Sequence, residues 1–156
     1  SSSATIFILL LMFIGGCSGS TAGGIKVIRW VVLSKQTENE VKKLLHPHGI
    51  FTIQLNGRVG RKDVVFSVAA FVFFYFFLTM ITTAVATLSG IDLISSFTAA
   101  LAMIGNIGPG LGAVGPVENF GFFESGIKWW FSFIMLAGRL ELYTMFIFFM
   151  PSFWKK

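Results

Sequence analysis

The feature that most constrains this chain is an apolar run long enough to cross a membrane. Val64–Leu88 contains 25 residues without a charge, a glycine or a proline. A helix of this length crosses the hydrocarbon core of a bilayer, which is roughly 30 Å thick. Only 12% of all residues are charged, about half the share found in soluble domains. The sequence therefore predicts an all-α integral membrane protein.

A second long run, Trp129–Met150, is apolar except at Gly138, Arg139 and Glu141. Pro151 follows it, and the chain ends in Trp-Lys-Lys, which is typical of an anchor at the membrane interface. We expect this run to form a second spanning helix.

Two shorter apolar runs, Ile6–Ile14 and Ile94–Ile104, have nine and eleven residues, too few to span a bilayer. Runs of that length are typical of core helices or re-entrant segments. Each is followed by glycine-rich sequence and then by a further apolar helix, so the same order occurs twice. Matching Ile14-Gly15 with Ile107-Gly108 sets the copies 93 residues apart. A match of Ile14-Gly15 to Ile104-Gly105 is the alternative.

The polar segment Ser34–Asp63 separates the two copies and carries half of the Lys and Arg residues in the chain. Short loops rich in Lys and Arg remain in the cytoplasm. We therefore expect the first long helix to run from inside to outside, the second glycine loop to re-enter from outside, and the C-terminus to be cytoplasmic. The net charge is +5. Nucleic-acid binding is disfavoured because this charge lies between and after apolar segments.

Both glycine-rich stretches interrupt the chain where lipid would surround it. Non-helical backbone is tolerated there only when it is buried in protein or lines a water-filled path. Backbone carbonyls and helix C-termini attract cations, and neither Ile14–Gly24 nor Ile104–Gly112 contains an acidic residue. The pattern predicts a carbonyl-lined path for monovalent cations, with K⁺ preferred because it loses its water more cheaply than Na⁺. The alternative is close helix packing at GxxxG spacings, which does not explain why both apolar runs end so early.

Two further features bear on conduction. The first glycine-rich stretch continues through Gly19–Gly24, and such an interruption just inside a filter could act as a moving gate. Arg139 lies within an apolar run, where a charge is costly unless it faces a wet or paired interior. On a cation path it would be a barrier or a gate. The alternative is an arginine that snorkels to the cytoplasmic interface.

Three other motifs give little evidence of catalysis, metal binding or phosphate binding. Cys17 has no nearby base to activate it, and His46-Pro47-His48 has no third ligand at a suitable spacing for a metal. The segment "GSTAGGIK" lacks the Ser or Thr that follows Lys in a phosphate-binding loop. With no nucleophile–base pair, the sequence does not predict an enzyme, and we expect no cofactor.

Four motifs in order resemble the TrkH-type potassium uptake proteins of the Trk/Ktr/HKT superfamily. They are "MFIGGCSGSTAGGIKVIR" (Met12–Arg29), "HPHGIFTIQLNGR" (His46–Arg58), "NIGPGLG" (Asn106–Gly112) and "GRLELYT" (Gly138–Thr144). The resemblance implies four helix–re-entrant pore helix–helix repeats around one K⁺ path, with non-helical filter loops. This chain matches the second half of the third repeat (residues 1–33), a basic cytoplasmic linker (34–63) and the complete fourth repeat (64–156).

The resemblance also assigns roles to residues. It implies K⁺ coordination by the backbone carbonyls of Gly15 and Gly108, and it makes Arg139 the pore arginine beneath the filter. The expected selectivity filter comprises Ile14, Gly15, Gly16, Asn106, Ile107, Gly108 and Pro109. The expected gating loop comprises Gly19, Ser20, Thr21, Ala22, Gly23 and Gly24.

The same resemblance implies partners and a location. We expect a multi-pass protein of the cytoplasmic (inner) membrane, in contact with membrane lipid, that forms a homodimer in its full-length parent. A cytosolic, TrkA-like nucleotide-binding regulatory subunit would dock on the cytoplasmic face. Since two repeats and one helix of the family pattern are missing, we expect the chain to be part of a longer protein. The alternative function is a non-conducting membrane fragment or assembly module that packs with partner chains.

Overall fold

The computed structural model describes residues 2–17, 19–20, 23–47, 49, 54–55, 58–59, 62–140, 144, 147 and 150–154. In chain order the elements are α1 (Ser2–Phe13), α2 (Val27–Leu45), β1 (Gln54–Leu55), β2 (Arg58–Val59), α3 (Lys62–Thr87), α4 (Leu93–Gly105), the short 3₁₀ helix η1 (Gly112–Val114), α5 (Ser125–Arg139) and α7 (Pro151–Trp154). The expected helical architecture is confirmed. The sequence did not predict the antiparallel β1–β2 ribbon inside the polar segment.

Helix α3 has the length and composition of a membrane span. Among the described residues, Asp63–Thr87 is the one helix that is long and apolar enough to cross a bilayer, with a mean hydropathy of 2.5. Only 28% of its most apolar stretch is buried inside the chain, which argues against the core helix of a soluble protein. Phe66, Phe73 and Met80 are each more than 60% exposed, at 73%, 73% and 66%. A helix that is apolar on all sides needs lipid or further protein around it.

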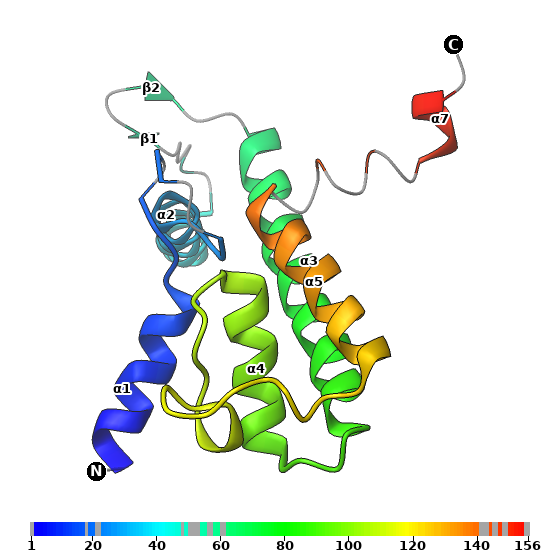
Figure 1. Ribbon diagram of the computed structural model, residues 1–156. Helices are drawn as coiled ribbons and strands as arrows, with labels where there is room; N and C mark the ends of the chain where they lie inside the picture. The colour runs from blue at the N-terminus through cyan, green and yellow to red at the C-terminus, as the bar shows by residue number, and fades with distance from the viewer. Residues whose placement is uncertain are drawn as a thin grey trace.

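Helix α4 is the centre of the structure, packed against α1, α3 and α5 (Figure 1). From Ser95 to Gly105 every residue except Phe97 is buried. Its small side chains, such as Ala99 and Ala102, allow neighbouring helices to approach closely. Asp92 caps its N-terminus by accepting a hydrogen bond from the backbone N–H of Ser95 at 3.1 Å.

Helix α4 and the loop after it form a hairpin that reaches only halfway along α3. Figure 1 shows α3 descending, α4 rising beside it, the loop after α4 descending again, and α5 rising next to α3. Helix α4 has 13 residues and α3 has 26. The loop therefore begins midway along α3 and returns to the end at which α4 started. This is the short-helix, glycine-loop, helix order that the sequence predicted for the second copy.

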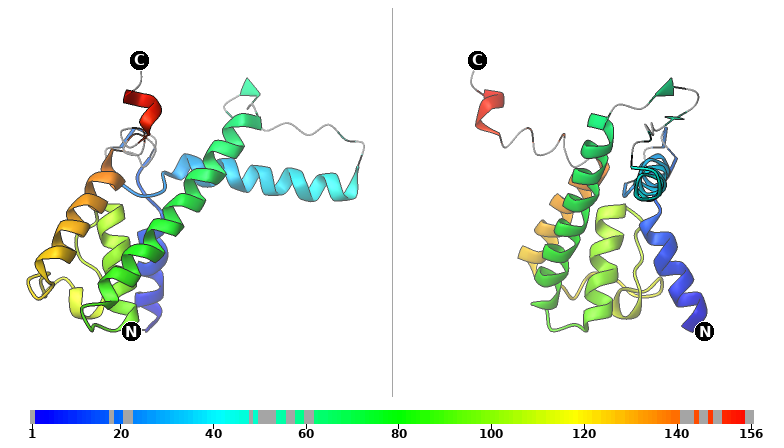
Figure 2. Two further views of the ribbon diagram at one scale, coloured as in Figure 1. Left: turned by 90° about the vertical axis from the view of Figure 1, so that its right-hand side faces the viewer. Right: turned by 180° about the vertical axis from the view of Figure 1, so that it is seen from behind.

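The first copy lies beside the second. Helix α1 rises next to α4 (Figure 1), and α2 then turns across α3 rather than along it (Figure 2). At this crossing the guanidinium carbon of Arg29 lies 3.8 Å from the ring centroid of the buried Phe71. Such a cation–π contact partly compensates a charge held against an apolar helix.

Helix α2 is longer than expected. It continues to Leu45, so the expected division at residue 34 falls inside one helix. Helix-favouring pairs in the polar half explain this: Lys42 Nζ lies 2.5 Å from Glu38, and Lys43 Nζ lies 2.7 Å from Glu40. Pairs three or four residues apart stabilise a helix by a few tenths of a kcal/mol each.

Helix α5 is shorter than expected, so the prediction of one uninterrupted helix over Trp129–Met150 is wrong. The helix begins at Ser125 and ends at Arg139, with Leu140 as its cap. Gly138, a poor helix former, lies in the last turn and is pressed against α4, as described below. Residues 141–143, 145–146 and 148–149 lie outside the described part of the chain.

Candidate functional site

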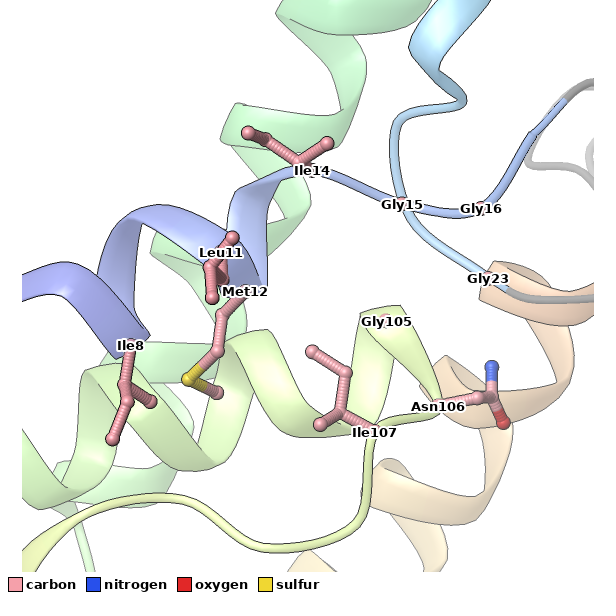
Figure 3. Close-up of a pocket in the computed structure, with 10 residues that line it drawn as sticks. All are labelled: Ile8, Leu11, Met12, Ile14, Gly15, Gly16, Gly23, Gly105, Asn106 and Ile107. Atoms are coloured by element: carbon pink, nitrogen blue, oxygen red, sulfur yellow. The ribbon is translucent and has the colours of Figure 1, made fainter.

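The two glycine-rich stretches meet in space. A pocket of about 350 Å³ lies between the end of α1, the loop after it and the end of α4 (Figure 3). Six residues expected in the filter or gate line it, together with Ile8, Leu11, Met12 and Gly105; these six are Ile14, Gly15, Gly16, Gly23, Asn106 and Ile107. None of the ten lining residues is ionisable. The polar atoms available to a ligand are therefore backbone groups, because the amide nitrogen of Asn106 is bonded to the Met135 carbonyl.

The first loop is held by backbone contacts. Ile14 and Ile25 form a parallel bridge in which the Gly15 N–H donates to the Ile25 carbonyl at 2.9 Å. The Gly16 carbonyl accepts a hydrogen bond from the Val27 N–H at 3.2 Å, so it is directed at the start of α2. A Cβ on Gly15 would lie 2.8 Å from the Gly23 carbonyl oxygen and 2.9 Å from that of Ile25. Gly15 is therefore required because there is no space for a side chain.

Gly23 and Gly24, the last two residues of the expected gating loop, lie directly on the end of α4. A Cβ on the buried Gly23 would lie 2.8 Å from the Ile104 carbonyl oxygen and 2.9 Å from both the Gly105 oxygen and the Asn106 Nδ2. Gly24 adopts a positive φ of 81°. The Ser20 N–H donates to the Cys17 carbonyl at 2.9 Å, which closes a turn, and Gly19 has open space around it. Thr21 and Ala22 lie outside the described residues.

The second loop begins with a Schellman-type turn. Asn106 has a left-handed conformation (φ 52°), its N–H donates to Met103, and the Ile107 N–H donates to the Ala102 carbonyl at 3.0 Å. This arrangement satisfies carbonyls at the helix end and stops α4. Because Ile107-Gly108 follows the helix as Ile14-Gly15 follows α1, whereas Gly105 is still helical, the structure favours the 93-residue match over the alternative.

Gly108 and Pro109 do not line the pocket shared by the two loops. Both are exposed, and Gly108 borders a separate pocket of about 390 Å³ against α5, beside Met103, Phe131 and Met135. Gly108 has a positive φ of 103°, and nothing lies within 4 Å of a Cβ built on it. This position therefore favours glycine for its conformation, not for lack of space.

Side chains of α4 hold the rest of the second loop. Thr98 Oγ1 accepts a hydrogen bond from the Leu111 N–H at 3.0 Å, and Ser95 Oγ accepts one from the Ala113 N–H at 3.0 Å. Neither residue was predicted from the sequence. A signal was present, because two hydroxyl side chains one turn apart in an apolar helix need partners.

Arg139 is the last residue of α5 and is exposed. Its neighbour Gly138 contacts the same end of α4 as Gly23 does, since a Cβ on Gly138 would lie 2.0 Å from the Ile104 carbonyl oxygen. The structure thus brings the arginine to the level at which the two loops meet. It does not make Arg139 a lining residue of the shared pocket.

A cation is the ligand that this arrangement suits. The C-terminal end of the buried α4 carries a partial negative charge, and it is directed at both loops. Within the described part of the chain, no group of three His, Cys, Asp or Glu residues could hold a metal ion. His48 of the His-Pro-His motif lies outside that part. The residues that converge here offer dipoles and carbonyl oxygens.

Known proteins share this sequence and this fold. The sequence profile of TrkH, described as a cation transport protein, matches residues 1–156. The Trk system potassium uptake protein TrkH of Vibrio parahaemolyticus is 40% identical over 156 aligned residues, which covers 96% of this chain and 30% of that protein. TrkH of Salmonella typhimurium and TrkG of Escherichia coli are each 37% identical, covering 97% and 96% of this chain.

The crystal structure of the potassium transporter TrkH from Vibrio parahaemolyticus superposes with a TM-score of 0.85 at 38% identity, covering 97% of this chain and 32% of that one. The chain spans about a third of the length of the relatives that it matches. The match over its whole length nevertheless shows the family: this chain belongs to the TrkH family of cation transport proteins.

Proposed function

We propose that this chain forms part of a potassium uptake protein of the cytoplasmic membrane, in which four pore loops surround one K⁺ path. The observation that carries the proposal is the pocket between the two glycine loops, which is lined by backbone and apolar groups at the C-terminal end of a buried half-length helix. Carbonyl oxygens and a helix C-terminus stabilise a dehydrated monovalent cation without a carboxylate. The names of the relatives, which are potassium uptake proteins, support K⁺ as the ion.

In this proposal α1 and α4 are re-entrant pore helices, and the segments Ile14–Gly16 and Asn106–Pro109 are two of the four filter strands. The carbonyls of Gly15 and Gly108 coordinate K⁺. The loop Gly19–Gly24 is the gate beneath the filter. Arg139 adds a positive charge to the path and so opposes conduction until it moves.

The proposed orientation follows from the charges. The β1–β2 ribbon of the polar segment and the end of α5 lie at the same end of α3 (Figure 1), and basic loops stay in the cytoplasm. The C-terminus is then cytoplasmic, where a TrkA-like nucleotide-binding subunit docks on a homodimer of the full-length protein. The non-conducting assembly module is the less supported interpretation, because the relatives are named as uptake proteins.

The test is K⁺ uptake by the full-length transporter that carries this chain, in bacterial cells that lack their own K⁺ uptake systems. We expect the wild type to restore growth at low K⁺. Gly108→Ser should slow uptake or admit Na⁺ at equal membrane expression. Gly90→Ser is the matched control, because Gly90 also has a positive φ (77°) and open space, but lies in the α3–α4 turn. Absence of K⁺ uptake by the wild type would refute the proposal, and equal behaviour of the two variants would remove Gly108 from the filter.

A further inference from the structure

The end of α5 touches the end of α4 with no side chain between them. A Cβ on Gly138 would lie 2.0 Å from the Ile104 carbonyl oxygen and 2.9 Å from the Ile104 carbonyl carbon. No side chain fits at that distance from a helix backbone. Gly126, near the other end of α5, has nothing within 4 Å of its Cβ position. Of the two glycines in α5, the one in the last turn is therefore the one that is enclosed.

A hydrogen bond ties the same two ends together. Asn106 Nδ2 donates to the Met135 carbonyl at 3.0 Å, and Figure 3 shows its side chain extending away from the pocket toward α5. Arg139 follows Met135 by four residues, so it lies one turn further along the same face of α5. The residue that ends α4 in a left-handed conformation thus also holds the turn that carries the arginine.

The first loop reaches this junction as well. The Cβ position of Gly23 lies 2.8 Å from the same Ile104 carbonyl oxygen that Gly138 approaches. It also lies 2.9 Å from the amide nitrogen of Asn106. The proposed gate, the filter end of α4 and the turn that carries Arg139 therefore share one carbonyl and one amide. Tight packing of this kind transmits displacement, because interiors have little free space.

We propose that Gly138 and Asn106 are positioning residues, which fix Arg139 relative to the filter and the gating loop. This inference rests on the proposed function, in which Arg139 opposes conduction. Gly138 sets how close the turn can come, and Asn106 sets its register by bonding Met135. Neither residue needs to touch the ion for its loss to change conduction.

A role exercised through Arg139 has a distinctive signature. If Gly138 and Asn106 act by placing the arginine, their substitutions should matter only while the arginine is present. Changes at independent sites multiply, whereas changes at coupled sites do not. A double-mutant cycle on uptake therefore separates positioning from general damage to the fold.

The experiment uses the full-length transporter in cells without other K⁺ uptake, with Rb⁺ uptake measured over a range of concentrations to obtain Vmax and KM. Gly138→Ala and Asn106→Gly are each made with Arg139 and with Arg139→Ala, and Gly126→Ala is the control on the same helix. Asn106→Gly keeps the left-handed conformation and removes the side-chain amide, with its bond to Met135 and its contact with Gly23. It tests the inference even if Gly138→Ala fails to reach the membrane.

We expect Asn106→Gly and Gly138→Ala to change Vmax by about fivefold or more beside Arg139 and by less than about twofold beside Arg139→Ala, with the Gly126→Ala control near wild type in both. Equal fold-changes in both backgrounds, or no change in either, would overturn the inference while leaving the transporter intact. Failure of the proposed function looks different, because the wild type itself would then take up no Rb⁺ or K⁺.

Discussion

The two glycine loops occupy matching positions in the two copies, yet they are built differently. The first loop is stabilised by its own backbone, through the Ile14–Ile25 bridge and the bond from Val27 to Gly16. The second is held by the hydroxyl groups of Ser95 and Thr98 on its own helix. A repeated sequence pattern can therefore give similar paths through unlike contacts.

The matched glycines differ in the same way. Gly15 is enclosed by backbone oxygens at less than 3 Å from its Cβ position, whereas Gly108 has open space and a φ of 103°. One position excludes a side chain by volume and the other by conformation. Substitutions can tell these reasons apart.

The largest effect is expected for Gly15→Ala. Its Cβ meets two carbonyl oxygens that belong to backbone and cannot rotate away, so the loop must shift, at a cost near the upper end of the 1–3 kcal/mol typical of overpacking. Thermal unfolding of the detergent-solubilised transporter should begin several degrees lower, and K⁺ uptake should fall. Gly126→Ala, which meets nothing, is the control. Equal stability of the two variants would show that Gly15 is not enclosed.

The next effect is expected at Gly108, where alanine costs about 1–2 kcal/mol in conformational strain. Asparagine tolerates a positive φ better than alanine does. Gly108→Asn should therefore be more stable than Gly108→Ala, whereas at Gly15 Asn should be at least as damaging as Ala. Thermal unfolding of the four variants checks this. A loss for Asn at position 108 that equals or exceeds the loss for Ala would mean that volume, not φ, decides there too.

A smaller effect is expected for Thr98→Val, which keeps the shape of the side chain and removes the acceptor for the Leu111 N–H. An unpaired, partly buried N–H costs about 1–2 kcal/mol. Hydrogen exchange should become faster over residues 108–114 and stay unchanged over residues 14–25. Thr87→Val, whose hydroxyl bonds only its own helix, should leave both segments unchanged. Faster exchange in both loops after Thr98→Val would contradict the separate anchoring described above.

The smallest effect concerns pH. Hydrogen bonds from the side chain and the backbone N–H of Ser95 lower the pKa of Asp92, the cap of α4. A carboxyl group whose pKa is lowered on folding stabilises the fold at any pH above its pKa in the unfolded chain, which is about 3.9. That stability is lost as the pH falls through the pKa of the folded state. Acidification below about pH 4 should loosen the second copy at α4 slightly. Asp92→Asn, which still caps but does not titrate, should remove this pH dependence; its persistence would assign the effect to another group.

Local sequence determined a large part of this protein. The uncharged run over Val64–Leu88 predicted α3, and the two short apolar runs predicted α1 and α4 to within a few residues. The glycine clusters marked where both helices stop. These features depend on hydropathy and backbone preference, which neighbouring residues set among themselves. The ordered motifs were sufficient to indicate the family.

The tertiary structure alone decided where these elements meet. Gly23 and Gly138 are 115 positions apart, yet both contact the Ile104 carbonyl. Because this contact depends on how α4 packs between α5 and the first loop, no local pattern could show it. The packing of distant segments also decided where α5 ends, and why glycine is needed at position 15 for lack of space but at position 108 for its conformation. Hydropathy places a segment in the membrane, but only the packed neighbours determine which atoms lie within 3 Å of a given Cα.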